Sequence, residues 1–399
     1  MIKRISVDQL RLGMFVHDLN CSWIDHPFLL SRFKVDQLEE LQKIRATGVR
    51  ELYIDTALGQ DSPEAPSAAE IHKELEKSMH EVVLLPMKPA RIPQEEERGR
   101  AREVLARAHR TVRQVMTDVR LGRAVEVDQV EDVVEAITTS ILRNDGALLS
   151  LCQIKDKDEY TFLHSVSVCT LLVAFCRSLG LPPETIRIAG IGGLLHDVGK
   201  MQVPNEILNK PGRLTSEEFE VIKRHPGDGF DLLSGVPGLA PEVLDITRHH
   251  HERMDGTGYP DALPGEQIAQ LAQMAAIVDV YDALSAERCY HKAMPPSEAL
   301  RKIYEWSRFH FNPDFVGAFL QCVGIYPTGS LVKLESGRLA VVLEQTPDDI
   351  LKPQVRAFFS TRSNTYIPPV RVDLSKGSDN VVSYESPSRW NVDSARFMV

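Results

Sequence analysis

A long stretch of helical periodicity, from about Glu97 to Ile325, constrains the fold of this 399-residue chain more than any other feature. Apolar side chains recur there every three or four residues, and Pro and Gly interrupt the pattern, as at Pro182–Pro183 and Gly256–Pro260. The pattern predicts helices at roughly 160–178, 184–198, 216–234, 240–251, 267–285 and 297–307, with almost no strand signal. We therefore expect an all-helical domain over residues 99–325.

The first helix of this domain, at about 99–121, has an apolar seam that two arrangements explain. The seam residues are spaced by 4, 3, 4, 3 and 4 positions, and they are Ala101, Leu105, Ala108, Val112, Val115 and Val119. An amphipathic helix packed on its own domain, with a solvated arginine-rich face, gives this pattern. A short homodimeric coiled coil gives it too. Because the seam ends before Gly122, under three heptads, both alternatives stay open.

The two ends of the chain differ from its centre. Short apolar stretches alternate with polar ones in residues 1–60, and residues 37–46 have helical spacing, which predicts a small mixed α/β accessory domain. Residues 61–98 are rich in Pro, Glu, Ser and Gly, so we expect a linker around one short helix. Residues 326–399 alternate in period two around Ser336–Gly337 and predict a small β appendage, followed by a polar, loosely ordered tail. The predicted class is mainly α.

Composition excludes several kinds of protein. The chain has 46 Lys and Arg against 56 Asp and Glu, a formal charge of -10, which argues against a nucleic-acid partner. Its 6 cysteines include no Cys-x-x-Cys pair, so a disulfide framework or zinc ribbon is not expected and a reducing compartment fits better. The longest apolar run is about half of the roughly 20 residues that span a bilayer. With no secretory signal at its start, the chain is expected to be cytoplasmic and without a membrane span.

Histidines and aspartates recur through the helical region in a pattern that suits metal ions. The group comprises His164, His196, Asp197, His225, His250, His251 and Asp279. His196 and Asp197 directly follow the apolar run IAGIGGLL, where burying them unpaired would cost several kcal/mol, and a metal ion supplies the compensation. Imidazole and carboxylate ligands suit Mn, Fe or Zn.

These seven ligands leave coordination positions open on two metal ions. With Asp197 bridging they offer about eight bonds, whereas two six-coordinate ions have about twelve positions. An open site of this kind indicates catalysis, and its natural reaction is phosphodiester hydrolysis, in which a metal-bridging hydroxide attacks phosphorus.

Two neighbouring features point to a phosphate-bearing substrate. Lys200 lies four residues after His196, on the same face of a predicted helix, where it either holds a phosphate or is an exposed helix-end lysine. Gly256 and Gly258 allow a sharp turn after the histidines. Tyr259 then lies beside the pocket, where it either stacks on a base or anchors the loop.

The chain resembles the HD-GYP family of metal-dependent phosphohydrolases. Five blocks, within a core at residues 150–325, carry the resemblance: HDVGK at 196–200, VPNEILNKPGRLTSEEF at 203–219, RHPGDGFDLL at 224–233, HHERMDGTGYP at 250–260 and IVDVYDALSAERCYHKA at 277–293. The segment SWIDHPF…GVRELYIDT in residues 1–60 is similar to an uncharacterised domain often found ahead of HD-GYP domains.

The resemblance implies an all-helical fold, a bi- or trinuclear iron or manganese site, and hydrolysis of cyclic di-GMP to linear pGpG and often to GMP. It implies the same seven metal ligands. It also implies that Lys200 and Arg288 contact substrate phosphate and that Asp282 is a candidate for assisting proton transfer.

Three positions depart from the family pattern. Trinuclear members carry a glutamate four residues before the first histidine, where this chain has Tyr160, so we predict two divalent ions, Fe or Mn. His291 replaces the usual Arg or Lys and would hold phosphate more weakly, although Lys292 is available as a substitute. His249 extends the usual histidine pair to three, and we expect it at the surface or behind the ligands.

Three functions fit the sequence. The first is an active cyclic di-GMP phosphodiesterase, which the complete set of ligand types favours. The second is a non-catalytic module that binds the dinucleotide or pairs with diguanylate cyclase (GGDEF) domains through the GYP loop. The third is a phosphohydrolase that acts on another nucleotide, such as a different cyclic dinucleotide.

Overall fold

The computed structural model describes residues 1–21, 32–82, 92–152, 160–210, 212, 214–286, 294–346 and 349–398. The chain divides into two compact units. The first unit is Met1–Ser78 with Asn209–Val221, and the second is Met79–Leu208 with Ile222–Val399.

The first unit contains a four-stranded antiparallel sheet in the order β1-β4-β2-β3. Its elements are β1 (Ile2–Ser6), η1 (Val7–Gln9), β2 (Phe15–Asp18), β3 (Phe33–Lys34), α1 (Leu38–Ala46) and β4 (Glu51–Asp55). Three successive residues of β4, Leu52 to Ile54, are buried, and Ile44 of α1 is fully buried with them. This mixture of strands and a helix confirms the predicted α/β character of the N-terminal domain. The unit also takes in most of α9 (Ser216–Ile222).

Much of the predicted linker is helical. Helix α2 (Ala68–Val82) has 15 residues and buries Ile71, Leu75 and Met79. The side chains of Ser67 and Glu70 form a capping box, in which each accepts a hydrogen bond from the other's backbone N–H, at 3.2 and 2.9 Å. The expectation of one short helix therefore underestimated this element. The apolar spacing of i, i+4 and i+8 and the Ser-x-x-Glu pair were the signals for it.

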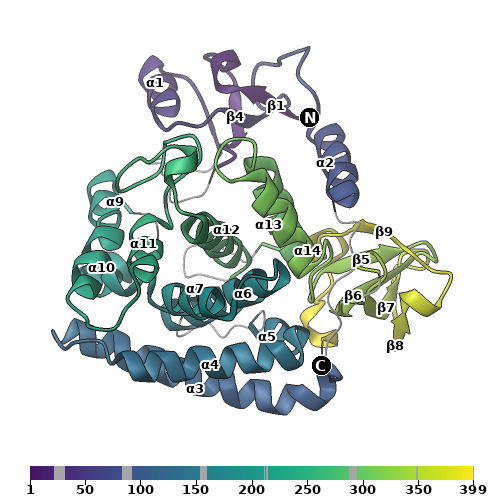
Figure 1. Ribbon diagram of the computed structural model, residues 1–399. Helices are drawn as coiled ribbons and strands as arrows, with labels where there is room; N and C mark the ends of the chain where they lie inside the picture. The colour runs from purple at the N-terminus through teal and green to yellow at the C-terminus, as the bar shows by residue number, and fades with distance from the viewer. Residues whose placement is uncertain are drawn as a thin grey trace. The chain divides into compact units, whose positions relative to one another are not determined.

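The second unit is built on helices, as predicted. They are α3 (Gln94–Arg120), α4 (Val127–Arg143), α5 (Asp145–Cys152), α6 (Tyr160–Ser178), α7 (Pro183–Leu195), η4 (Val198–Gln202), α8 (Asn205–Leu208), α10 (His225–Ser234), α11 (Pro241–His249), η5 (Gly265–Gln267), α12 (Gln270–Ser285), α13 (Pro296–Trp306) and α14 (Pro313–Val323). Helices α6, α7 and α12 lie at the centre of the domain, and α3 and α4 run side by side along one edge (Figure 1).

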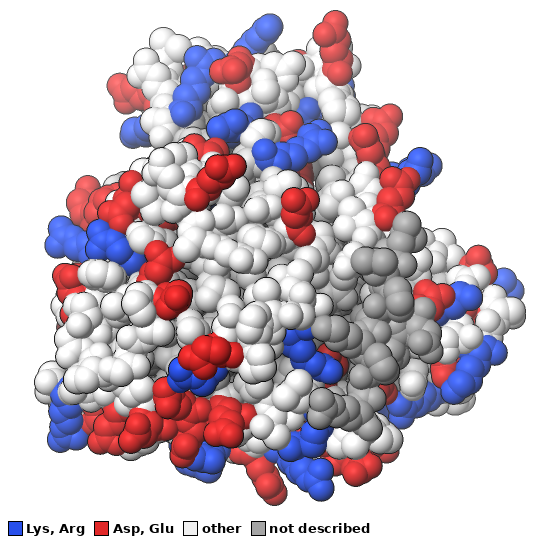
Figure 2. Space-filling model, in the orientation of Figure 1, with Lys and Arg blue, Asp and Glu red and all other residues white. Residues whose placement is uncertain are grey.

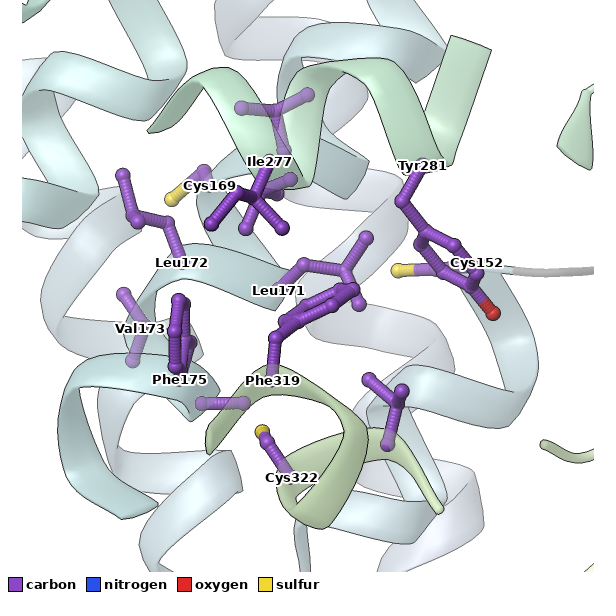
Figure 3. Close-up of a cluster of buried hydrophobic side chains, with 14 of the residues drawn as sticks. Cys152, Cys169, Leu171, Leu172, Val173, Phe175, Ile277, Tyr281, Phe319 and Cys322 are labelled. Carbon is purple, nitrogen blue, oxygen red and sulfur yellow. The ribbon is translucent and has the colours of Figure 1, made fainter. Parts of the chain in front are cut away.

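The core of this unit is an apolar cluster between α6, α12 and α14. Phe175 and Phe319 meet edge to face with ring centroids 5.3 Å apart, and Tyr281 packs against Phe319 at the same distance (Figure 3). Ile277 lies in the same cluster and is fully buried. Burial on nearly all sides explains why α6 and α12 carry apolar residues almost all round. It also fixes rigidly the few polar residues that these helices carry.

The apolar seam of α3 is buried within the chain. All six seam residues are buried, and the helix packs against α4, α5 and α6. The buried carboxylate of Glu97 also accepts hydrogen bonds from Ser140 and, twice, from the guanidinium of Arg143, each at 2.7 Å. The packed amphipathic helix is therefore the alternative that describes α3, and its seam is not available to a second chain.

Two predicted helices end earlier than expected. The predicted helix at 216–234 is divided into α9 and α10, because Pro226 lies in the first turn of a new helix, where its missing N–H costs nothing. The predicted helix at 184–198 ends at Leu195, and the chain continues through His196 and Asp197 into the 3-10 helix η4.

The C-terminal appendage is a five-stranded antiparallel sheet in the order β8-β7-β6-β5-β9. Its strands are β5 (Leu331–Leu334), β6 (Arg338–Glu344), β7 (Gln354–Ser360), β8 (Thr365–Asp373) and β9 (Val381–Tyr384). Gly337, with a φ of 78°, makes the turn between β5 and β6 at the place that the sequence predicts.

The expectation of a loosely ordered tail is wrong. Strand β9 pairs with β5, and η6 (Leu374–Lys376) lies between β8 and β9. After β9 come α15 (Pro387–Trp390) and η7 (Ala395–Phe397). The ring of Phe397 stacks on Phe358 with centroids 4.1 Å apart, and Trp390 meets Phe359 edge to face. A few aromatic residues thus hold a segment whose overall composition is polar.

The surface agrees with the balanced composition. On the face drawn in Figure 2, the described Lys and Arg side chains are interspersed with Asp and Glu and form no large basic patch. Among the described residues, no helix has the length and hydropathy to cross a membrane.

Candidate metal centre

The seven predicted ligands converge in the second unit from five separate segments. They lie on α6 (His164), after α7 (His196, Asp197), at the start of α10 (His225), at the end of α11 (His250, His251) and on α12 (Asp279). Six of the seven are buried, each with 6% exposure or less. The side chain of His251, at 16%, is the accessible member of the group.

The ligand atoms form two triads. His164, His196 and Asp279 make the first triad, and within each triad every pair of potential ligand atoms lies within 4.8 Å. His225, His250 and His251 make the second. A third group of His196, Asp197 and His250 overlaps both, so the two triads are neighbours.

Asp197 lies between the two triads. Its Oδ2 atom is 3.4 Å from Nε2 of His196 and 3.6 Å from Nε2 of His164, both in the first triad. Its Oδ1 atom is 3.3 Å from Nε2 of His225 in the second. One carboxylate oxygen therefore faces each triad, which is the arrangement that a bridging ligand needs.

Local hydrogen bonds fix the tautomer of four histidines. Nδ1 of His196, His225 and His250 donates to the backbone carbonyls of Gly193, Ile222 and Thr247, at 2.8, 2.7 and 2.9 Å. Nδ1 of His164 donates to Oδ2 of Asp282 at 2.7 Å. Because a carbonyl or carboxylate oxygen only accepts, each Nδ1 carries the hydrogen, and each neutral ring presents a lone pair at Nε2.

Unsatisfied buried atoms show that this set fits a cation. Nε2 of His196 and Oδ1 of Asp197 are buried and have no hydrogen-bond partner among the described residues. The Nε2 atoms of His225 and His250 approach each other to 3.3 Å although both carry lone pairs. Two ligands bound at about 2.1 Å and at right angles to one another lie about 3 Å apart. Divalent cations would satisfy these atoms together, and the mixed imidazole and carboxylate set suits such ions.

Burial keeps the second triad neutral. It lowers the pKa of His225 and His251 and, helped by the neighbouring His196, lowers the pKa of His250 to about 3. Burial also opposes the charge on Asp197 and Asp279, but the neighbouring imidazoles outweigh it and hold both carboxyl pKa values well below the usual range. The second triad thus contains neutral imidazoles, and Asp197 and Asp279 are ionised at neutral pH, which are the ligand forms of both groups. Burial opposes the charge on His196, but the neighbouring Asp197 outweighs it and raises the pKa of that imidazole.

Gly199 allows the two halves of the site to approach. A Cβ atom at this position would lie 2.0 Å from the carbonyl oxygen of His225 and 2.5 Å from the backbone N of Gly229. Only a glycine in η4 therefore lets α10 pack closely enough to bring His225 beside Asp197.

Lys200 lies against Asp197 rather than one α-helical turn from His196. Its Nζ is 2.5 Å from Oδ2 of Asp197. The α-helix ends at Leu195, and in the 3-10 geometry that follows, residues i and i+3 lie one above the other. The side chain is 19% exposed, so its ammonium group lies at the accessible side of the site with His251.

The loop after the histidines folds back onto them. The ring of Tyr259 stacks on His251, with centroids 4.7 Å apart and planes at 25°. Buried Glu252 accepts hydrogen bonds from the backbone N–H groups of Asp261 and Leu263, at 2.7 and 3.0 Å. A Cβ at Gly258 would lie 2.4 Å from Cα of Glu252, so glycine is required there. Tyr259 thus makes the contact expected of a loop anchor.

His249 faces away from the two triads. Its Nδ1 bonds Asp245 at 2.7 Å, and its Nε2 bonds Asp261 at 3.0 Å. Arg288, His291 and Lys292 lie outside the described residues, as does the side chain of Tyr160. Their predicted roles therefore rest on the sequence alone.

Sequence reasoning missed how the ligands are oriented. Asp282 accepts a hydrogen bond from Nδ1 of His164, on the side of the ring away from Asp279, which the sequence did not predict; its role in proton transfer stays a prediction. The spacing of three residues between Asp279 and Asp282 could have predicted this contact, because it places both side chains on the face of α12 that lies against α6. Glu252 gave no signal of its own, because its partners are backbone groups of a loop.

Comparisons with known proteins show which family the chain belongs to. An HD domain model matches residues 152–315, and a domain of unknown function, DUF3391, matches residues 2–130. Cyclic di-GMP phosphodiesterase PA4108 of Pseudomonas aeruginosa is 46% identical over 398 residues, which cover 98% of this chain and 94% of that protein. The chain belongs to the HD-GYP family.

Two further proteins are similar to parts of this HD-GYP chain. The cyclic di-GMP phosphodiesterase response regulator RpfG of Xanthomonas campestris is 41% identical over 170 residues, 42% of this chain and 44% of that protein. The solved structure of Bd1817, an HDGYP protein from Bdellovibrio bacteriovorus, has a TM-score of 0.48 and 20% identity, over 80% of this chain and 98% of that chain.

Proposed function

We propose that this HD-GYP chain hydrolyses cyclic di-GMP to linear pGpG at a binuclear metal centre. The pair of buried triads with Asp197 between them is the observation that carries the proposal. Full-length similarity to a cyclic di-GMP phosphodiesterase supports the same substrate. Further cleavage of pGpG to GMP would use the same groups.

Each triad would hold one divalent ion. His164, His196 and Asp279 would bind the first ion, His225, His250 and His251 would bind the second, and Asp197 would contribute an oxygen to each. Iron or manganese suits this donor set. When bound, the two ions would supply Lewis acidity at the phosphoryl oxygens and activate the attacking water. Tyr160, in place of the glutamate of trinuclear members, supports two ions.

Asp282 would act by positioning. As the acceptor for Nδ1 of His164, it orients that ring and increases the electron density at Nε2. The three backbone carbonyls do the same for His196, His225 and His250 without a charge. We therefore propose control of a ligand as a role of Asp282, beside its predicted role in proton transfer.

Substrate would approach from the side of His251, Lys200 and Tyr259. These side chains are partly exposed, while the rest of the site is buried. The Lys200 ammonium would attract the phosphodiester as a point charge. Tyr259 would hold the loop beside the bound nucleotide, and Arg288 and Lys292 remain the proposed further phosphate contacts.

The test is turnover by purified protein loaded separately with Mn²⁺ and, under reducing conditions, with Fe²⁺. Metal analysis should give two ions per chain, and chromatography should show pGpG accumulating from cyclic di-GMP. A different cyclic dinucleotide, 3'3'-cGAMP, is assayed in parallel. Faster turnover of that compound would assign the chain to another substrate.

Adjacent histidines provide matched variants. His250→Ala removes a member of the second triad and should reduce the metal content to about one ion. His249→Ala removes a neighbour that contacts neither triad and should keep two ions. Equal metal content in both variants would contradict the ligand assignment. Two bound ions without turnover of either dinucleotide would instead favour the docking module.

A further inference from the structure

A cavity that is partly open to solvent lies behind the metal centre, where the helical core meets the C-terminal appendage. It has a volume of about 230 Å³ and is lined by α5, α6, α12, the start of α13, β5 and the C-terminal segment. Tyr281, Asp282 and Ser285 of α12 form its polar side, and Leu149, Leu171 and Met398 are among its apolar walls. No role described above uses it.

Tyr281 indicates that the cavity takes a polar ligand atom. Its side chain is 2% exposed, and its hydroxyl has no hydrogen-bond partner among the described residues. The ring packs against Phe319, and both Tyr281 and Cys152 belong to the cavity wall. A buried hydroxyl without a hydrogen-bond partner destabilises the fold, and a bound partner would recover that loss.

The remaining polar groups define what that partner carries. Ser285 Oγ donates its hydrogen to the carbonyl of Tyr281 at 2.8 Å, so it offers the cavity an acceptor. The Asp282 carboxylate, which accepts a hydrogen bond from Nδ1 of His164, likewise lines the cavity with acceptor oxygens. These acceptors favour a ligand that brings a hydrogen-bond donor and carries no negative charge.

Size limits the ligand further. A dry cavity of about 150 Å³ accommodates benzene. The present volume is about one and a half times larger, which corresponds to a bicyclic aromatic such as indole. The apolar walls suit a ring system of that kind.

Asp282 connects the cavity to the metal centre. It lines the cavity and also accepts the hydrogen bond from Nδ1 of His164, whose Nε2 lies 2.9 Å from Asp279 in the first triad. We propose that this cavity is a regulatory site for a small uncharged aromatic molecule with an N–H donor, and that its occupation weakens metal binding at the first triad through Asp282. The regulatory step rests on the proposed function, whereas ligand binding does not.

The experiment measures binding to the metal-free full chain by ligand-observed NMR. Indole is the probe, benzofuran is the isosteric control without an N–H, and indole-2-carboxylate is the anionic control. Indole should bind about tenfold more tightly than benzofuran, and the carboxylate should not bind. Equal binding of indole and benzofuran, or no binding of indole, would overturn the site.

Two variants test whether indole binds in this cavity rather than elsewhere on the protein. Tyr281→Phe removes only the hydroxyl, so it should weaken indole binding while keeping or raising the thermal stability of the free protein. Loss of stability would mean that the hydroxyl already has a structural partner. Leu149→Trp, on the cavity wall, should block indole and leave two-ion binding intact.

The regulatory step has its own readout. Mn²⁺ titration with saturating indole should show at least a threefold weaker first-triad site in the wild type and no change in Leu149→Trp. Indole binding with unchanged Mn²⁺ affinity would refute the coupling. Failure of Mn²⁺ binding without indole would instead refute the proposed metal centre.

Discussion

Replacing Glu252 tests whether a buried carboxylate holds the loop that carries Tyr259. Glu252 is 2% exposed and accepts two backbone hydrogen bonds, from Asp261 and Leu263. Hydrogen bonds to a charged acceptor contribute about 1.5–3 kcal/mol each. Glu252→Gln keeps one acceptor oxygen and places an amide N–H₂ against the other donor, so it should cost about 2 kcal/mol. That energy corresponds to about a 30-fold increase in the open loop.

Hydrogen exchange measures this opening directly. The backbone amides of Asp261 and Leu263 should exchange about 30-fold faster in Glu252→Gln than in wild type, because the loop opens more often. The KM for cyclic di-GMP should rise while the metal content stays at two ions. Glu266→Gln, an exposed glutamate in the same loop region, is the matched control and should change neither quantity. Unchanged exchange in Glu252→Gln would refute the reasoning.

Three further changes have defined outcomes. Glu97→Ala leaves Arg143 without its buried partner and should lower the free energy of unfolding by about 3 kcal/mol in a urea titration; a loss below 1 kcal/mol would contradict the pairing. The guanidinium of Arg248 bonds to Asp261 and lowers the pKa of its carboxyl group to about 2. The carboxyl group of Asp261 is therefore protonated at a higher pH in the unfolded chain than in the folded protein. Stability should therefore fall as the pH decreases from about 4 to 2, and Asp261→Asn should flatten that slope; parallel slopes would contradict it. Phe397→Ala removes a partly buried ring from the C-terminal sheet and should cost about 2 kcal/mol, measured by thermal unfolding, with no change in metal content.

The helical core was predictable because its signals are local. Periodicity identified α6 and α12, and Gly and Pro marked most helix ends. Where the prediction failed, a few side chains decided the outcome. Trp390 and Phe397 hold a polar tail on its sheet, and Ile71, Leu75 and Met79 give α2 a buried face within a segment of linker composition.

The candidate ligands were also predictable, but their geometry was not. Residue type and order, with the family resemblance, identified all seven residues that converge. Lys200 was misplaced because the α-helix gives way to a 3-10 turn just before it, and periodicity does not register such a change within one turn. The orientation of His164 depends on Asp282, 118 residues away, a distance over which sequence spacing carries no information.

The carbonyls that hold His196, His225 and His250 each belong to the residue three positions earlier in the chain. As soon as each local turn forms, Nδ1 of its imidazole donates to the carbonyl, and Nε2 is left available to a cation. Folding therefore prepares these three side chains before any ion arrives. Metal incorporation at the proposed centre would then depend on access past His251, with little rearrangement of the protein.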